Sequence, residues 1–111
     1  MASSLSGYRL VWIMVRFDLP VLTKKERKAA TRFRNFLLDE GFEMSQFSVY
    51  LRFCSGKEQG EWITRHIERN VPPTGKVHIV YFTDKQYENI VCFDGRKREQ
   101  TRRNPEQFAL F

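Results

Sequence analysis

Asp18 is the acidic residue whose position in the sequence best suits metal chemistry. It directly follows the apolar segment Arg9 to Phe17, and Leu19-Pro20 then turns the chain away. A carboxylate at the end of a strand can hold Mg²⁺, which polarises a phosphoryl oxygen and lowers the pKa of a bound water. Aspartate before Leu-Pro is also a common turn former, so both interpretations stay open.

One carboxylate is a poor metal site by itself. Mg²⁺ usually takes one or two protein carboxylates, and waters and substrate phosphates complete its shell. A homodimer can bring two copies of Asp18 together across a two-fold axis. A metal-dependent phosphodiesterase built on this chain would therefore use Asp18 as its catalytic and metal-binding residue, with Arg16 steadying the scissile phosphate.

The positive charge is concentrated in two segments. The chain has 19 Lys and Arg against 13 Asp and Glu, a net charge of +6. Residues 24–34 carry a local +5 and residues 96–103 a local +4, so the remainder is slightly acidic. Patches of this kind suit phosphate binding, although Lys and Arg runs are also common on solvated helix faces. The cations that we expect to contact nucleic-acid phosphates are Arg16, Lys24, Lys25, Arg27, Lys28, Arg32 and Arg34.

The histidines and cysteines do not form a ligand set. His66 and His78 stand apart from any Cys, Asp or Glu at metal-ligand spacing, so we expect both to be packing residues. Cys54 and Cys92 match no zinc pattern, and we expect two reduced thiols. The sequence contains no phosphate-loop, dinucleotide, zinc-protease or serine-hydrolase motif.

The longest apolar run, Leu10 to Val15, is far too short to span a bilayer, which takes about 18 residues or more. No signal-peptide cleavage pattern follows it, and we expect a cytoplasmic protein. Residues 1–7 are polar, which predicts a disordered N-terminus or an expression remnant.

Hydrophobic periodicity and capping signals predict the elements that position these residues. Thr23 to Glu26 is a capping box that opens a helix over residues 24–40, ended by Gly41. A second capping box, from Ser55 to Glu58, opens a helix that runs to about residue 70. The predicted strands are residues 9–17, two within 42–54 that divide near Ser45-Gln46, 76–83 and a short one at 90–93, with a helical turn at 84–88.

This order, βαββαβ, predicts an α+β, ferredoxin-like fold over residues 8–95 with an additional short C-terminal strand. Two helices would cover one face of the antiparallel sheet and leave the other bare. The side chains that we place on the bare face by strand alternation are Tyr50, Arg52, His78, Val80 and Phe82. An exposed apolar and aromatic sheet face predicts dimerisation or stacking on bases.

The C-terminal segment, residues 96–111, begins basic and ends apolar. Phe108, Leu110 and Phe111 would gain little by staying in water, so we expect them to dock on the dimer mate or on another partner protein. A terminal strand that packs on the edge of its own sheet is the alternative.

Two short strings carry a family resemblance. Phe17-Asp18 ends the first strand, and Gln46-Phe47-Ser48-Val49-Tyr50 opens the third. With the basic helix between them, they resemble the CRISPR-associated protein 2 family (Cas-two), in the variety found beside Cas-nine effectors. The resemblance covers Arg9 to Phe93.

The resemblance implies a ferredoxin-like homodimer with a Mg²⁺ or Mn²⁺ site between paired copies of Asp18, and endonuclease activity on RNA or DNA. It also implies a role in spacer acquisition, in which the dimer holds double-stranded protospacer DNA on its basic surfaces and bridges the Cas-one integrase. Three hypotheses follow: a DNA-binding scaffold, a metal-dependent phosphodiesterase, and a ferredoxin-like regulatory or assembly module without nuclease activity.

Overall fold

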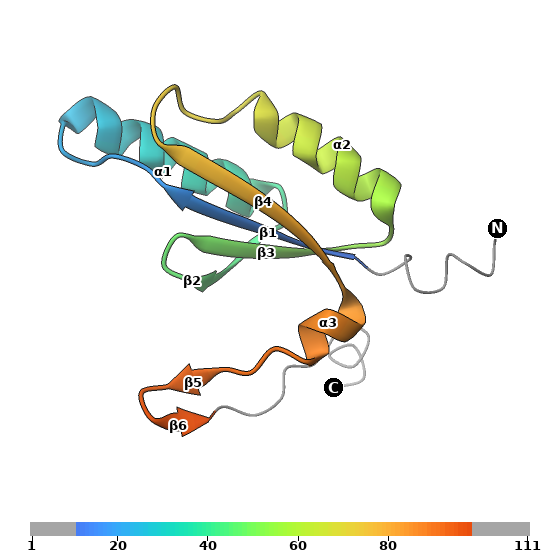
Figure 1. The fold of residues 1–111 in the computed structure, drawn as a ribbon. Helices are drawn as coiled ribbons and strands as arrows, with labels where there is room; N and C mark the ends of the chain where they lie inside the picture. Colours follow the sequence, from blue (N-terminus) through green and yellow to red (C-terminus); the bar gives the residue numbers. More distant parts are fainter. Residues whose placement is uncertain (1–10, 99–111) are drawn as a thin grey trace.

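The computed structural model of the chain describes residues 11–98, an antiparallel sheet with helices packed on it (Figure 1). Among these residues, no helix is both long enough and apolar enough to cross a membrane. In chain order the elements are β1 (Val11–Asp18), α1 (Lys24–Asp39), β2 (Glu43–Gln46), β3 (Val49–Cys54), α2 (Lys57–Glu68), β4 (Lys76–Thr83), α3 (Asp84–Glu88), β5 (Phe93–Asp94) and β6 (Lys97–Arg98).

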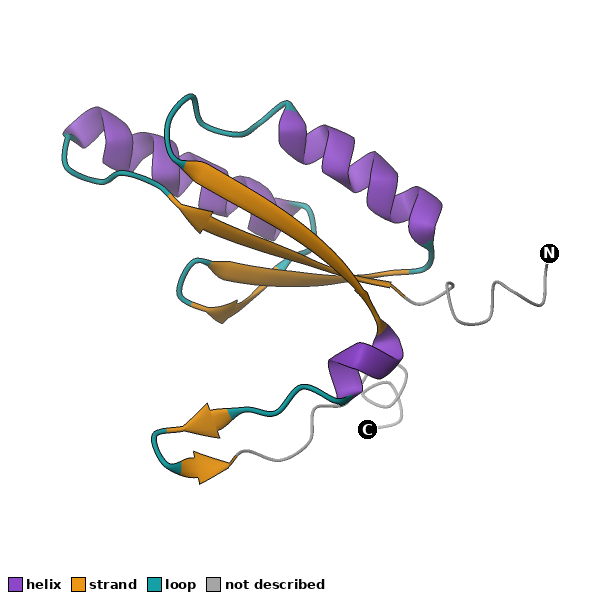
Figure 2. Ribbon diagram, in the orientation of Figure 1, coloured by secondary structure: helices purple, strands orange, loops and turns teal. Residues whose placement is uncertain are grey.

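The main sheet has the strand order β2-β3-β1-β4, and all its neighbouring strands are antiparallel. The helices α1 and α2 lie on one face of it, purple against the orange strands in Figure 2. This arrangement is compatible with the predicted ferredoxin-like α+β fold. β1 lies between β3 and β4, and β4 pairs with it along its full length.

The start and end of α1 follow the predicted signals. The Thr23 hydroxyl accepts from the Glu26 amide at 3.1 Å, and the Glu26 carboxylate accepts from the Thr23 amide at 2.9 Å, so the capping box is confirmed. At the other end Gly41 adopts a φ of 90°, which lets the Phe42 amide turn back and donate to the Leu37 carbonyl at 3.0 Å. The helix therefore covers the predicted range and ends one residue earlier.

The capping box that was predicted for α2, between Ser55 and Glu58, is not formed. Gly56 occupies the N-cap position, and no side chain caps the first turn. Instead, Gln59 accepts at its side-chain oxygen from the Ser55 amide at 2.9 Å and from the Ser55 hydroxyl at 3.2 Å. The side chain that reaches back to Ser55 is therefore that of Gln59, four residues later, and not that of Glu58. The reason is that the N-cap residue is Gly56 rather than Ser55.

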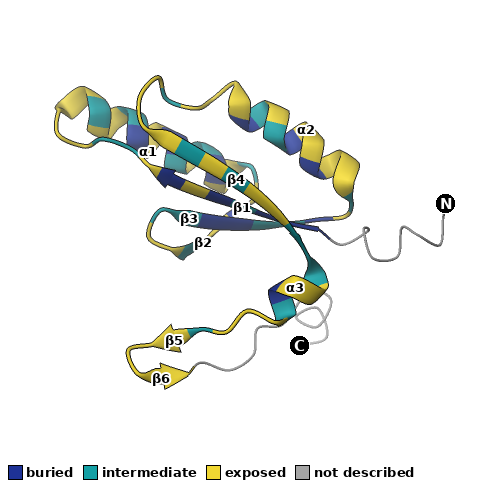
Figure 3. Ribbon diagram, in the orientation of Figure 1, coloured by how far each residue is buried: buried dark blue, intermediate teal, exposed yellow. Residues whose placement is uncertain are grey.

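The main core lies between the sheet and the two long helices. Its fully buried members include Ile13 and Val15 of β1, Leu37 of α1 and Ile63 of α2, each 0% exposed. Figure 3 shows the same division, with dark blue residues on the facing sides of the layers and yellow ones outside. Cys54 is buried in this core, and burial raises the pKa of its thiol, an effect that the nearby Arg52 charge partly opposes.

The two faces of β3 are opposite to the prediction. Tyr50 and Cys54 point into the helix-side core, whereas Leu51 and Phe53 lie on the other face. That other face carries its own apolar cluster around Trp12, so both faces of β3 hold apolar residues and alternation cannot tell them apart. Placing Tyr50 and Arg52 on the bare face was therefore wrong. His78, Val80 and Phe82 are on that face, because they pair in register with Arg16, Met14 and Trp12.

The face of the sheet that α1 and α2 leave open is covered at one end by α3. Tyr87 stacks on Trp12 with ring centroids 3.9 Å apart, and the Trp12 indole donates to the Asp84 carboxylate at 3.0 Å. The rest of this surface, which we call the open face, runs toward the Asp18 end of β1. It carries Met14, Val49 and Val80, with the Val80 side chain 43% exposed.

The short C-terminal strand predicted at residues 90–93 lies elsewhere. β5 begins at Phe93 and pairs with β6 in a separate hairpin, and neither strand joins the main sheet. Because Asp94 pairs with Lys97, the turn consists of Gly95 and Arg96, and Gly95 has a φ of 65°. Glycine with a positive φ at the first position of a two-residue turn is a hairpin signal, and it explains why the strand starts later and finds a local partner.

Candidate functional site

Asp18 is the last residue of β1 and lies exposed on the open face. Its register partner across the sheet is Lys76, the first residue of β4. Arg16, two residues earlier, shares this face and pairs with His78. Opposite residues of an antiparallel pair have Cβ atoms about 5 Å apart, so one carboxylate, two cations and one imidazole gather at this end of the sheet.

His66 and His78, both predicted to be packing residues, differ in their surroundings. His66 packs against Phe36 and Trp62, which confirms the prediction. His78 is exposed beside Arg16, so the prediction that it is a packing residue is wrong. The error arises because alternation placed it on the bare face but did not show that this end of the face is polar.

The turn that precedes β4 lies close against the backbone of Asp18. Gly75 precedes β4 with a φ of 94°, and a Cβ added there would lie 2.8 Å from the Asp18 carbonyl oxygen and 2.8 Å from the Leu19 side chain. The turn can therefore approach Asp18 only without a side chain. No local signal in the sequence indicates that Gly75 approaches Asp18, so sequence reasoning missed its role as a positioning residue.

We expect Gly75→Ala to lower the free energy of unfolding by more than about 2 kcal/mol. The left-handed backbone alone costs an alanine roughly 1–2 kcal/mol, and the contact with Asp18 adds to it. Gly95→Ala is the matched control, because Gly95 also has a positive φ but its added Cβ would meet nothing within 4 Å. Urea denaturation compares the two. Equal losses in both variants would contradict the contact with Asp18.

The two sequence segments that carry the family resemblance, Phe17-Asp18 and Gln46 to Tyr50, lie next to each other in the structure. The Phe17 amide donates to the Ser48 carbonyl at 3.1 Å, just beyond the last paired residues of β1 and β3. Ser48 itself has a φ of 65°, an unusual conformation for a residue with a side chain, and it forms the turn from β2 into β3. Asp18 and this turn thus share one end of the sheet.

The donor set around Asp18 fits a metal only in part. Within residues 11–98, no group of three or more His, Cys, Asp and Glu side chains could hold an ion. Asp18 supplies one exposed carboxylate, and Lys76 beside it repels a cation. Mg²⁺ accepts a shell of one or two carboxylates with waters and phosphates, so the residues fit one half of a site that a second copy of the chain would complete.

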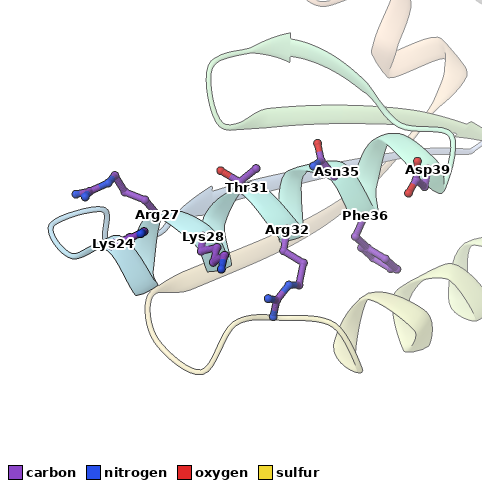
Figure 4. Close-up of a pocket in the computed structure, with 8 residues that line it drawn as sticks. All are labelled: Lys24, Arg27, Lys28, Thr31, Arg32, Asn35, Phe36 and Asp39. Carbon is purple, nitrogen blue, oxygen red and sulfur yellow. The ribbon is translucent and has the colours of Figure 1, made fainter.

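The cations of α1 fall into two groups. Lys24, Lys28 and Arg32 are spaced by four residues, and we call them the basic row; they line a shallow groove of about 680 Å³ along the outer face of α1 (Figure 4). No salt bridge engages them within the described part of the chain. A row of exposed, unpaired cations about 6 Å apart along the helix axis is suited to a line of phosphates.

The other predicted cations of α1 are placed differently. The Arg27 guanidinium donates to the carbonyls of Val21 and Leu22 at 3.1 and 3.0 Å, so it secures the loop before α1. Arg34 is half-buried and donates to the Thr31 hydroxyl at 3.4 Å. Lys25 is exposed. The structure therefore brings four of the six helix cations that the sequence singled out to the groove, three in the basic row and the fourth, Arg27, bound to the loop carbonyls.

Arg16 belongs to a different surface from the basic row. It lies on the open face, and α1 covers the opposite face of the sheet. The sequence grouped Arg16 with the helix cations by residue type alone. Phe108, Leu110 and Phe111, and residues 1–7, lie outside the described residues.

Comparison with known proteins identifies relatives over the whole described region. The family model for CRISPR associated protein Cas2 matches residues 11–90. A protein of Paracidovorax avenae named CRISPR-associated endoribonuclease Cas2 is 60% identical over 96% of this chain and 99% of its own length. Proteins of the same name from Flavobacterium psychrophilum and Parvibaculum lavamentivorans are 46% and 42% identical, over 96% and 91% of this chain and 93% and 100% of their own lengths. The matched segment contains both strings that carried the resemblance, and the chain belongs to the CRISPR-associated protein Cas2 family.

Proposed function

We propose that this protein is a DNA-binding subunit of CRISPR spacer acquisition, which as a homodimer holds protospacer duplex by its phosphates and bridges the Cas-one integrase. The basic row on α1 is the observation that carries the proposal. Its cations face outward without ion-pair partners in the described chain. Contacts of this kind fix a duplex in place and read no sequence, which suits a protein that must accept DNA of any sequence.

The open face supports the dimer. Met14, Val49 and Leu51 line a cavity of about 600 Å³ between the sheet and the segment that leads into β5. Val91 and Phe93 of that segment are 51% and 63% exposed. The exposed apolar side chains beside this cavity favour association, because a second copy packed against Val91 and Phe93 would remove them from water.

Duplex binding is expected to depend on the basic row. In the triple variant Lys24→Gln, Lys28→Gln, Arg32→Gln, the slope of log affinity against log salt should fall by about 2.7, or 0.9 for each lost phosphate contact. The affinity for duplex DNA at low salt should fall on the order of tenfold to a hundredfold. Fluorescence anisotropy with a labelled duplex over a salt series measures both quantities.

The control removes the same charge elsewhere. Lys57→Gln, Arg65→Gln, Lys85→Gln changes exposed cations on α2 and α3 and gives the same net charge. Its salt slope should stay within experimental error of the parent. Equal losses in the two triple variants would show that total charge, and not the basic row, determines binding. Failure of the parent to bind any polynucleotide at moderate salt would favour the regulatory or assembly module.

A second function, metal-dependent endonuclease activity on RNA or DNA, is favoured by the exposed position of Asp18 and by the endoribonuclease names of the relatives. In a dimer that pairs the open faces, two copies of Asp18 would hold the Mg²⁺ or Mn²⁺ ion. A bound ion would supply Lewis-acid stabilisation of the developing phosphoryl charge. Arg16 and Lys76 would bind and orient the phosphate that lies beside the carboxylates.

A further inference from the structure

The basic row leads into a group of aromatic side chains at the contact between α1 and α2. Phe36 is the next member of the same four-residue spacing after Lys24, Lys28 and Arg32, and it lines the same groove. Each step of four residues turns about 40° around the helix, so the row winds toward α2 as it advances. Figure 4 shows the Phe36 ring directed toward α2.

Two aromatic residues of α2 continue this line. The His66 ring meets Phe36 edge-on at a centroid distance of 5.4 Å, and Trp62 meets His66 at 5.2 Å. We call Phe36, His66 and Trp62 the aromatic step. The Trp62 side chain is 55% exposed, which leaves ring surface in contact with solvent.

The aromatic step is held in place from α1. Glu40 is the next residue in the four-residue spacing after Phe36, and it accepts from His66 Nδ1 at 3.0 Å. With this bond and the contacts to Phe36 and Trp62, the imidazole is fixed from three sides. A surface aromatic group with a fixed neighbour loses little conformational freedom when a flat ligand stacks on it.

The charges around the aromatic step favour a polyanion as its occupant. The groove that Phe36 lines has four cations, Lys24, Arg27, Lys28 and Arg32, against one acid, Asp39, and the Glu40 carboxylate beside the step is engaged by His66. An apolar protein partner would gain nothing from this excess of positive charge. A cationic track beside an exposed aromatic surface is the arrangement by which proteins bind single strands, with phosphates on the track and bases on the rings.

We propose that the aromatic step is a stacking site for an unpaired base of a single-stranded nucleic acid, whose phosphates lie along the basic row. The inference rests on the proposed phosphate-binding role of α1 and adds a class of ligand to it. A base inside a duplex has no free face to offer Trp62, so the site distinguishes single strands or splayed ends from paired DNA.

The test compares three probes of equal length: a single-stranded oligonucleotide, the same strand with abasic residues, and a duplex. Trp62→Ala should weaken binding of the single strand about tenfold and change the other two affinities by less than about twofold. Its salt slope should equal that of the parent, because no charge is lost. Trp62→Phe should restore most of the lost affinity, since a phenyl ring also stacks.

Leu38→Ala is the matched control, because Leu38 is an apolar residue of α1 that is 48% exposed and does not line the groove. It should leave all three affinities unchanged. The single strand should also quench the fluorescence of the parent but not of Trp62→Phe, since the remaining indole, Trp12, is 7% exposed.

Failure of this inference is distinguishable from failure of the proposed function. Equal loss of affinity for the base-containing and abasic strands in Trp62→Ala, or no loss at all, would overturn the stacking site. Loss of duplex binding in the basic-row triple variant would still support the phosphate track. Conversely, a base-dependent loss in Trp62→Ala with an unaltered salt slope in the triple variant would support stacking and overturn the track.

Discussion

Replacement of Asp18 by asparagine is expected to slow metal-dependent cleavage of RNA or DNA at least a hundredfold. Metal-ion stabilisation of phosphoryl charge contributes several kcal/mol, and each 1.4 kcal/mol is about a factor of ten in rate. The amide keeps the shape of the side chain and removes its charge, so the strand end should stay intact. Duplex affinity should change by less than about twofold, because Asp18 lies on the opposite side of the sheet from the basic row.

The measurement is cleavage of a labelled strand over a titration of Mg²⁺ and of Mn²⁺, with parent and variants purified in parallel. Glu68→Gln is the matched control, because it also replaces a carboxylate by its amide, at an exposed position on α2 outside the groove. Cleavage by Asp18→Asn at the rate of the parent would show that the activity belongs to a contaminant or to another site.

Val80→Glu is expected to raise the dimer dissociation constant at least a hundredfold. Val80 lies 43% exposed on the open face, with Met14 as its register partner. A carboxylate buried there without a partner costs several kcal/mol, and a two-fold dimer contains the substitution twice. Sedimentation velocity over a concentration series measures the constant.

Val21→Glu provides the comparison, because Val21 is 54% exposed in the loop before α1 and lies outside the open face. It should leave association unchanged. If paired copies of Asp18 hold the metal, cleavage should fall with dimerisation in Val80→Glu and recover at high protein concentration. A dimer of undiminished affinity in this variant would place the interface elsewhere.

The elements that the sequence predicted well are those with local signals. The capping box at Thr23 and Glu26 and the apolar spacing after it determine α1 within one residue, because both act over neighbouring turns. β4 matches its predicted range of 76–83 for a similar reason, since Pro72-Pro73-Thr74-Gly75 is a sequence that ends helices and directly precedes the strand.

The errors arose where the answer depended on distant residues. Leu51 and Phe53 of β3 lie in a cluster with Trp12 and Tyr87, and the stack within it joins residues 75 positions apart, which no local pattern contains. The chemistry of the Asp18 end was only partly predictable for the same reason. The end of the apolar segment and the following Leu19-Pro20 located Asp18 at the end of a strand, but its neighbours Lys76 and His78 depend on the register between β1 and β4.

The stack of Tyr87 on Trp12 limits how a second copy could approach the sheet. Because α3 occupies the far end of this face, an incoming sheet can rest only on the half nearer Asp18. In a symmetric dimer that pairs the open faces, the two sheets must be offset along the strand direction so that neither copy contacts the α3 of the other. The bulk of one aromatic pair would thus act as a spacer that sets where the symmetry axis crosses β1, and with it the separation between the two carboxylates.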